Sequence, residues 1–76
     1  MNHSNIARGR QVRRALLAVA RECQAQGVLL PTYATLGAAL GLSNPQISRH
    51  INRLLDDGVM QVSQVGRRFR IKGVQP

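Results

Sequence analysis

Cysteine, aromatic residues and acidic residues are all scarce in this 76-residue sequence. Cys23 is the single cysteine, which excludes an intramolecular disulfide framework and indicates a reducing compartment. Trp is absent, and only one Tyr and one Phe occur, so the core must be built from aliphatic residues. No run of about 18 apolar residues is present, and the N-terminus lacks the apolar centre of a signal peptide. We therefore expect one soluble, cytoplasmic domain without membrane contact.

The shortage of acidic residues argues against an enzyme. Only three occur, and the neighbouring Asp56 and Asp57 are predicted to point in different directions at a helix end, so they form no convincing acid/base pair. His3, His50 and Cys23 lack the spacing of metal ligands, and neither a phosphate-binding glycine loop nor a Ser-His-Asp set is visible. We expect no catalytic activity, no metal and no cofactor.

Basic residues, in contrast, are abundant. Eleven Lys and Arg against three acidic residues give a formal net charge of +8, and ten of the eleven are Arg. Such an excess opposes compact folding by self-repulsion and is typical of proteins with an anionic partner. Because a planar guanidinium can form two hydrogen bonds with one phosphate or one guanine, the preference for Arg favours nucleic acid.

The clearest structural signal is the stretch SNPQISRHINRLLDDG, residues 43–58. Ser43 followed by Gln46 predicts a capping box, in which each side chain bonds the other residue's backbone, so a helix begins at Asn44. Pro45 is tolerated in the first helical turn, and Gly58 supplies the left-handed residue that ends the helix.

This helix is predicted to have two unlike faces. One face is an apolar stripe at helical spacing, formed by Ile47, Ile51, Leu54 and Leu55. The rest is polar and contains the residue types that contact base edges or phosphates, namely Asn44, Gln46, Ser48, Arg49, His50, Asn52 and Arg53. For this helix taken alone, a merely solvated face is the alternative interpretation.

Residues 1–9 are polar and are expected to form a flexible basic arm. From Arg10 to Gln26 the apolar residues keep helical spacing, and Gly27 stops the helix. Cys23 lies on its apolar side and is expected to be a buried structural thiol. Several arginines crowd the start of this helix, where its dipole disfavours cations by roughly 0.3 to 1 kcal/mol each: Arg8, Arg10, Arg13 and Arg14. A nearby phosphate backbone would offset that cost, and equally the arm could be solvated.

The middle of the chain has the pattern of a helix-turn-helix. Val28–Leu30 is apolar and long enough for one brief strand. Thr32 has the chemistry of an N-cap for a short helix over Tyr33–Leu40, whose inward residues are expected to be Leu36, Ala39 and Leu40. A tight turn at residues 41–43 then leads into the capped helix.

After Gly58 the period changes to that of strands. Val59–Val65 is rich in β-formers, residues 66–67 supply a turn, and Arg68–Lys72 alternates strictly. The alternation places Phe69 and Ile71 on one face and Arg68, Arg70 and Lys72 on the other. We expect a hairpin with one apolar and one basic face, within a domain over residues 10–73 that is followed by a tail at 74–76. A solvated sheet face is the alternative interpretation of these cations.

The order helix, short strand, helix, helix, hairpin resembles the winged helix-turn-helix of bacterial transcription regulators. The segment PTYATLGAALGLSNPQISRHINRLLDDGVMQVSQVGRRFRI is similar to the DNA-binding domains of GntR-type and MarR-type regulators and to the amino-terminal domain of LexA-type repressors. The resemblance is carried by Leu36, Ala39, Leu40, Gly41, Leu42, Ser43, Ile47, Ile51, Leu54, Leu55, Gly58, Val59 and Met60. It implies a mainly α fold with a small β-hairpin, that is, three helices plus a two- to three-stranded wing. It also implies that the helix from Asn44 is the recognition helix and that Arg67 and Arg68 lie at the wing tip.

From the residues and the resemblance together we predict sequence-specific binding of double-stranded DNA by a small transcriptional repressor of bacterial, phage or plasmid origin. The residues expected at the DNA are Thr32, Tyr33, Thr35, Ser43, Asn44, Gln46, Ser48, Arg49, Arg53, Arg67, Arg68 and Arg70. The chain ends soon after the wing, so we expect no small-molecule effector. We also consider a homodimer, because single small modules of this kind bind DNA weakly.

Two alternatives stay open. One is a protein-interaction winged-helix module that inhibits or adapts a host nucleic-acid machine. The polar face of residues 44–53 has no aromatic or Leu anchor of the kind that dominates protein interfaces, which favours nucleic acid. The other is RNA or non-specific binding, although RNA readers usually display more aromatic residues than Tyr33 and Phe69.

Overall fold

The computed structural model describes residues 3–76 of the protein. Three helices come first, α1 (His3–Gln26), α2 (Tyr33–Leu40) and α3 (Asn44–Asp56), and two strands follow, β1 (Met60–Val65) and β2 (Arg68–Val74). The strands pair as an antiparallel hairpin. The predicted fold class, mainly α with a small β-hairpin after three helices, is confirmed.

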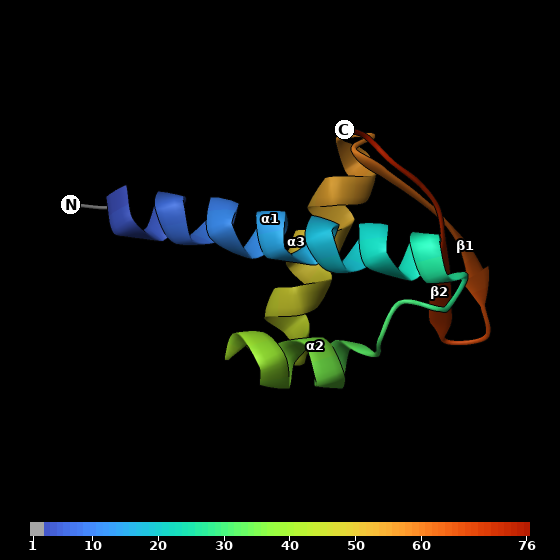
Figure 1. The fold of residues 1–76 in the computed structure, drawn as a ribbon. Helices are drawn as coiled ribbons and strands as arrows, with labels where there is room; N and C mark the ends of the chain where they lie inside the picture. The colour runs from blue at the N-terminus through green and yellow to red at the C-terminus, as the bar shows by residue number, and fades with distance from the viewer. Residues whose placement is uncertain (1–2) are drawn as a thin grey trace.

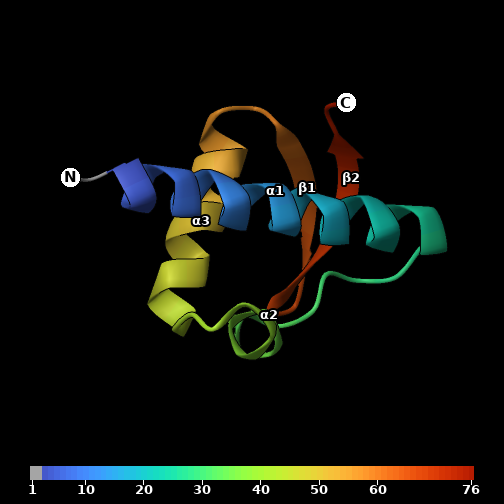
Figure 2. The same ribbon diagram turned by 60° about the vertical axis from the view of Figure 1, so that its left-hand side comes forward.

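Helix α1 lies across both α3 and the hairpin (Figures 1 and 2). In both views α2, the start of α3 and the hairpin turn lie on one side of α1, whereas the end of α3 and the C-terminus lie on the other. The two ends of α3 therefore belong to different edges of the molecule. None of the helices within residues 3–76 combines the length and the apolar character that a membrane span needs.

The core is aliphatic, as the shortage of aromatic residues required. Its fully buried large side chains are Leu16, Leu30, Ile47, Ile51 and Met60. Helix α1 contributes one stripe at helical spacing, which consists of Val12, Leu16, Ala20 and Cys23. Burial raises the pKa of the Cys23 thiol, so this cysteine is a protonated core residue, and the prediction of a structural thiol is confirmed.

Two sequence predictions require correction near α1. The helix begins at His3 rather than at Arg10, so residues 3–9 of the expected flexible arm are helical, while residues 1 and 2 lie outside the described part. Gly9 is accommodated inside the helix, where glycine lowers stability by about 1 kcal/mol without ending the helix. The expected strand at Val28–Leu30 is reduced to one bridge, between Leu29 and Arg70, because Pro31 follows and has no backbone N–H to continue a ladder.

Smaller differences concern α2 and the end of the hairpin. Ala39, expected to face inward, is exposed, and Gly37 is buried beside Leu36 instead. Strand β2 continues through Val74, so the expected tail at 74–76 is partly strand, and the Gln75 N–H donates to the Val59 carbonyl at 2.8 Å. The hairpin turn is the expected pair Gly66 and Arg67, and Gly66 adopts a φ of +63° that suits the first position of a type II′ turn.

Gly37 is required by the turn between α2 and α3. The Leu42 N–H donates to the Gly37 carbonyl at 2.9 Å, which brings the turn backbone over the helix. A Cβ at Gly37 would clash with the Leu42 carbonyl oxygen, whereas a Cβ at Gly9 would meet only the mobile end of the Arg13 side chain, at 3.3 Å. Both glycines lie within helices, so the same substitution can be compared at a position where a Cβ clashes with the backbone and at one where it meets only a side chain.

We predict opposite effects for the same substitution at these two positions. Gly37→Ala should lower the free energy of unfolding by about 1 to 3 kcal/mol, because the backbone oxygen cannot move without opening the turn. Gly9→Ala should raise it by about 0.5 to 1 kcal/mol through helix propensity. Urea denaturation followed by circular dichroism measures both. A stabilised Gly37→Ala protein would contradict the close approach of the turn.

Candidate nucleic-acid interface

The predicted capping box fixes the start of α3. The Ser43 N–H donates to Gln46 Oε1 at 2.9 Å, and the Gln46 N–H donates to Ser43 Oγ at 3.3 Å. Gly58 has a φ of +72°, which ends the helix as predicted. Because Ser43 and the Gln46 oxygen are engaged within the protein, the Gln46 amide nitrogen is the group of this pair that can still donate to a ligand.

Burial determines which side of α3 faces outward. Ile47 and Ile51 are 0% exposed and Leu54 is 4% exposed, so the predicted apolar stripe is confirmed and the opposite side faces solvent. Asn44 and Arg49 are exposed on α3, and Ser48 is half-buried on its flank.

Arg53 and Asp57 form an ion pair at the end of α3. The Arg53 Nε and the Asp57 Oδ2 lie 3.6 Å apart, and the two side chains are 62% and 55% exposed. An ion pair this exposed contributes little to stability, so the guanidinium can exchange its partner for another anion. The carboxylate nevertheless lowers the positive potential at this end of the helix.

The arginines of the hairpin have unequal roles. Arg68 donates from Nε and Nη2 to the Leu30 carbonyl, at 3.3 and 3.1 Å, and Arg70 donates to the Gly27 carbonyl at 3.5 Å. Both side chains therefore bind the loop between α1 and α2 and satisfy backbone carbonyls there. Arg67, in the turn itself, is exposed at the tip of the hairpin.

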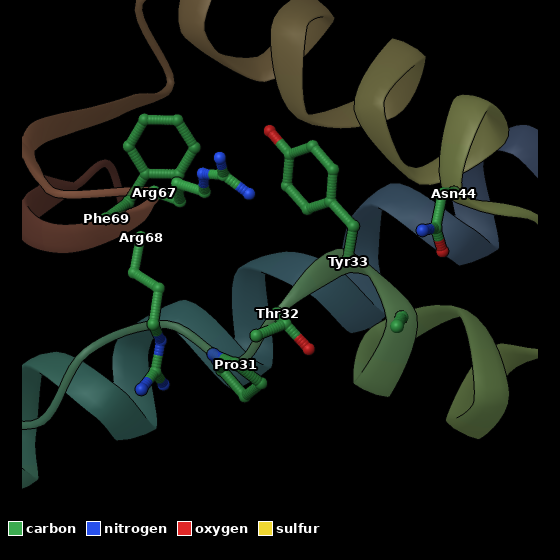
Figure 3. Close-up of a pocket in the computed structure, with 8 residues that line it drawn as sticks. Pro31, Thr32, Tyr33, Asn44, Arg67, Arg68 and Phe69 are labelled. Carbon is green, nitrogen blue, oxygen red and sulfur yellow. The ribbon is translucent and has the colours of Figure 1, made fainter.

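Three segments meet around a cavity of about 460 Å³. It is lined by Pro31, Thr32, Tyr33 and Ala34 at the start of α2, Asn44 at the start of α3, and Arg67, Arg68 and Phe69 of the hairpin. Figure 3 shows the Arg67 side chain directed toward Tyr33, whereas the Arg68 side chain turns away. The structure thus brings together five of the predicted residues from distant parts of the sequence, namely Thr32, Tyr33, Asn44, Arg67 and Arg68.

The start of α2 presents hydroxyl groups at this cavity. Thr32 Oγ1 accepts from the Thr35 N–H at 3.2 Å and donates to Thr35 Oγ1 at 3.0 Å, which confirms the predicted N-cap. Tyr33 and Phe69 have ring centroids 6.4 Å apart, so their rings pack together. Burial raises the pKa of the Tyr33 hydroxyl, which therefore stays protonated and able to donate a hydrogen bond.

His50 links α3 to α1, a contact that the sequence did not suggest. Arg13 Nη1 lies 3.4 Å from His50 Nδ1, across 37 residues of sequence. Burial lowers the pKa of His50, and the charges of Arg13, Arg49 and Arg53 lower this pKa further. The imidazole is therefore neutral at pH 7, with Nδ1 positioned to accept from Arg13.

We predict that His50 makes the protein less stable in mild acid. Because its pKa is lower in the folded state than in the unfolded state, the unfolded state binds the proton more tightly, and stability rises with pH up to the unfolded pKa. The free energy of unfolding should therefore increase between about pH 5 and pH 7. His50→Asn should remove this slope, as measured by urea denaturation of the variant and of the unchanged protein across that range. Equal slopes in the two proteins would refute the assignment.

Comparisons of this sequence with protein-family models, with curated proteins and with solved structures find no match. The resemblance to winged helix-turn-helix regulators therefore stays a prediction from the sequence. What the molecule itself provides is an exposed polar face on α3, an exposed arginine at the hairpin turn, and a cavity that joins the starts of α2 and α3 to the hairpin.

Proposed function

We propose that the protein binds double-stranded DNA sequence-specifically and acts as a small transcriptional repressor of bacterial, phage or plasmid origin. The observation that carries the proposal is the outward face of α3. It is polar and exposed, it contains Arg49, and its start shares a cavity with Tyr33 and the hairpin-turn residue Arg67. An α-helix fits the major groove of B-DNA, where such side chains can read base edges.

In this proposal the start of α3 enters the major groove. Arg49 is suited to two hydrogen bonds with one guanine, and Asn44 to two with one adenine. Gln46 adds a single donor, because its oxygen is held by Ser43. Arg53 lies further along the helix, where it can exchange Asp57 for a phosphate.

Sugar and phosphate contacts come from the neighbouring segments. Thr32, Tyr33 and Thr35 offer donors at the start of α2, and Arg67 offers a cation at the hairpin turn. A backbone strand that crosses the cavity would meet both sets, which fixes the register of α3 in the groove. The net charge of +8 favours this association at low salt. No reaction and no cofactor enter the proposal, and two copies on adjacent half-sites would raise the affinity of a single module.

The proposal is tested by fluorescence anisotropy with the promoter region of the protein's own gene and with a scrambled duplex, at two salt concentrations. Tight binding to the promoter alone is the expected result. Equal and strongly salt-dependent binding to both duplexes would make the protein a general nucleic-acid binder, and no binding to either would refute the proposal.

We predict that Arg49→Ala weakens promoter binding by about 1 to 3 kcal/mol and relaxes specificity at one base pair. The reason is the loss of two hydrogen bonds to a single base. Gln11→Ala, at an exposed position on α1 outside the proposed contact residues, is the control and should change affinity much less. Titration of promoter duplexes with single base changes measures both effects. An Arg49→Ala protein with unchanged base preference would contradict the role of this residue.

A second experiment should distinguish the roles of Arg67 and Arg68 at the hairpin turn. Arg67→Ala should weaken binding to all sequences alike and lower the salt slope by about one, because one phosphate contact is lost. Arg68→Ala should lower the melting temperature instead, since its guanidinium holds the Leu30 carbonyl. A lower salt slope for Arg68→Ala without a change in melting temperature would reverse the assignment.

A further inference from the structure

A second concavity, of about 510 Å³, lies between α1 and the far end of α3. Its lining includes Arg10, Arg14, Leu17 and Arg21 of α1, with Leu54 of α3 and Val59 just beyond. The first cavity is bordered by Asn44 at the start of α3, and the second by Leu54 near its end. At 1.5 Å per residue these two residues are roughly 15 Å apart along the helix axis, so the two concavities flank opposite ends of α3. We refer to the second concavity as the arginine groove.

The wall formed by α1 is a stripe of like charge. Arg10, Arg14 and Arg21 share one face of the helix with Leu17, and like charges one turn apart, as at Arg10 and Arg14, destabilise a helix. Within residues 8–76 the one ion pair joins Arg53 to Asp57, so no carboxylate of this part neutralises the stripe. Stability does not explain Arg10 and Arg14, whereas an anionic ligand would.

Two of the arginines are available to such a ligand. Arg21 donates to the Gln75 carbonyl at 2.8 Å, and Arg13, which also borders the groove, contacts His50. Arg10 and Arg14 are exposed, and within residues 8–76 neither side chain forms a hydrogen bond. They lie one helical turn apart, which suits two carboxylates on successive turns of a partner helix or on an extended segment.

The apolar floor of the groove favours a protein ligand over a nucleic acid. Leu17 and Val59 are half-buried and Leu54 is nearly buried, so the surface between the arginines is apolar. A phosphodiester backbone has no apolar group for such a floor. Asp57 in the same lining repels phosphates and carboxylates alike, so the apolar floor is the feature that separates the two kinds of ligand. A protein segment can combine carboxylates with an apolar side chain.

A second copy of this protein is a poor occupant. Its only acidic residues are Glu22, Asp56 and Asp57, against eleven basic ones. Asp57 already pairs with Arg53, and no stretch of the sequence carries an acidic run. Charge complementarity therefore requires a different protein.

We propose that the arginine groove binds an acidic segment of another protein, with its carboxylates on Arg10 and Arg14 and one apolar side chain on the floor of Leu17, Leu54 and Val59. The proposal does not depend on DNA binding. If both hold, the segment and the DNA occupy opposite ends of α3, so the protein can hold a partner at its operator.

The test uses the full-length protein and two fluorescent peptides of Asp and Glu residues, one with a central Leu and one with Ser in its place. The Leu peptide should bind about tenfold more tightly, because burial of its apolar group contributes about 1.5 kcal/mol or more. In an NMR titration it should shift the amide signals of Arg14, Leu17 and Val59 rather than those at the start of α3.

Charge-matched variants locate the site. The double variant Arg10→Glu, Arg14→Glu should weaken Leu-peptide binding at least about tenfold, whereas Arg49→Glu, Arg67→Glu, with the same net charge, should change it by less than about threefold. All four side chains are exposed, and thermal melting followed by circular dichroism confirms that both proteins fold.

Three outcomes would overturn the proposal. Equal weakening in both double variants, with no preference for the Leu peptide, would show unspecific charge attraction. A short DNA duplex that shifts the signals of Arg14 and Leu17 more than the peptide does would make the groove a nucleic-acid site. Sedimentation that shows self-association of the protein, abolished by Arg10→Glu, Arg14→Glu, would make the occupant a second copy.

Discussion

The burial of Ile47 and Ile51 is the contact on which the arrangement of the molecule depends. Both side chains are 0% exposed, and each contributes about 1.5 to 3 kcal/mol when removed from water. Such terms have to outweigh the self-repulsion of a protein with a net charge of +8. Because these two residues fix the rotation of α3 about its axis, they also determine that Arg49 faces solvent. Core packing and the candidate interface are thus two faces of the same helix.

The arginines divide into those that hold the fold and those that remain available. Arg21, Arg68 and Arg70 donate to backbone carbonyls of other segments, which replaces water at groups that the short loops leave unpaired. Arg49 and Arg67 are exposed at the edge proposed to meet DNA. Net charge alone could not make this division, because it depends on which carbonyls lie within reach.

What the sequence predicted correctly is local in origin. The capping box needs only Ser43 and Gln46, the end of α3 needs only Gly58, and the stripe of α3 is a matter of period. The contacts that it missed join residues far apart. Arg68 and Leu30 are separated by 38 residues, and Arg13 and His50 by 37, so neither pair leaves a pattern in the sequence. The start of α1 was misplaced for a local reason, since Gly9 is a weak signal that a long helix can override.

The cavity at the start of α3 shows the same difference between what local sequence patterns predict and what only the fold reveals. Residue types predicted Thr32, Tyr33, Asn44, Arg67 and Arg68 singly, but only the fold shows that they surround one concavity. The alternation of the last strand assigned Phe69 to an apolar face, and only the fold shows that it packs against Tyr33 at this cavity. At the other end of the helix, the Arg53–Asp57 pair lowers the positive potential just where the arginine groove begins. A phosphate backbone along α3 would therefore be held most strongly near Asn44 and Arg49 and would weaken toward Asp57. The Asp57 carboxylate thus lies between the basic surface at Arg49 and the arginine groove, and it keeps the two surfaces from merging into one.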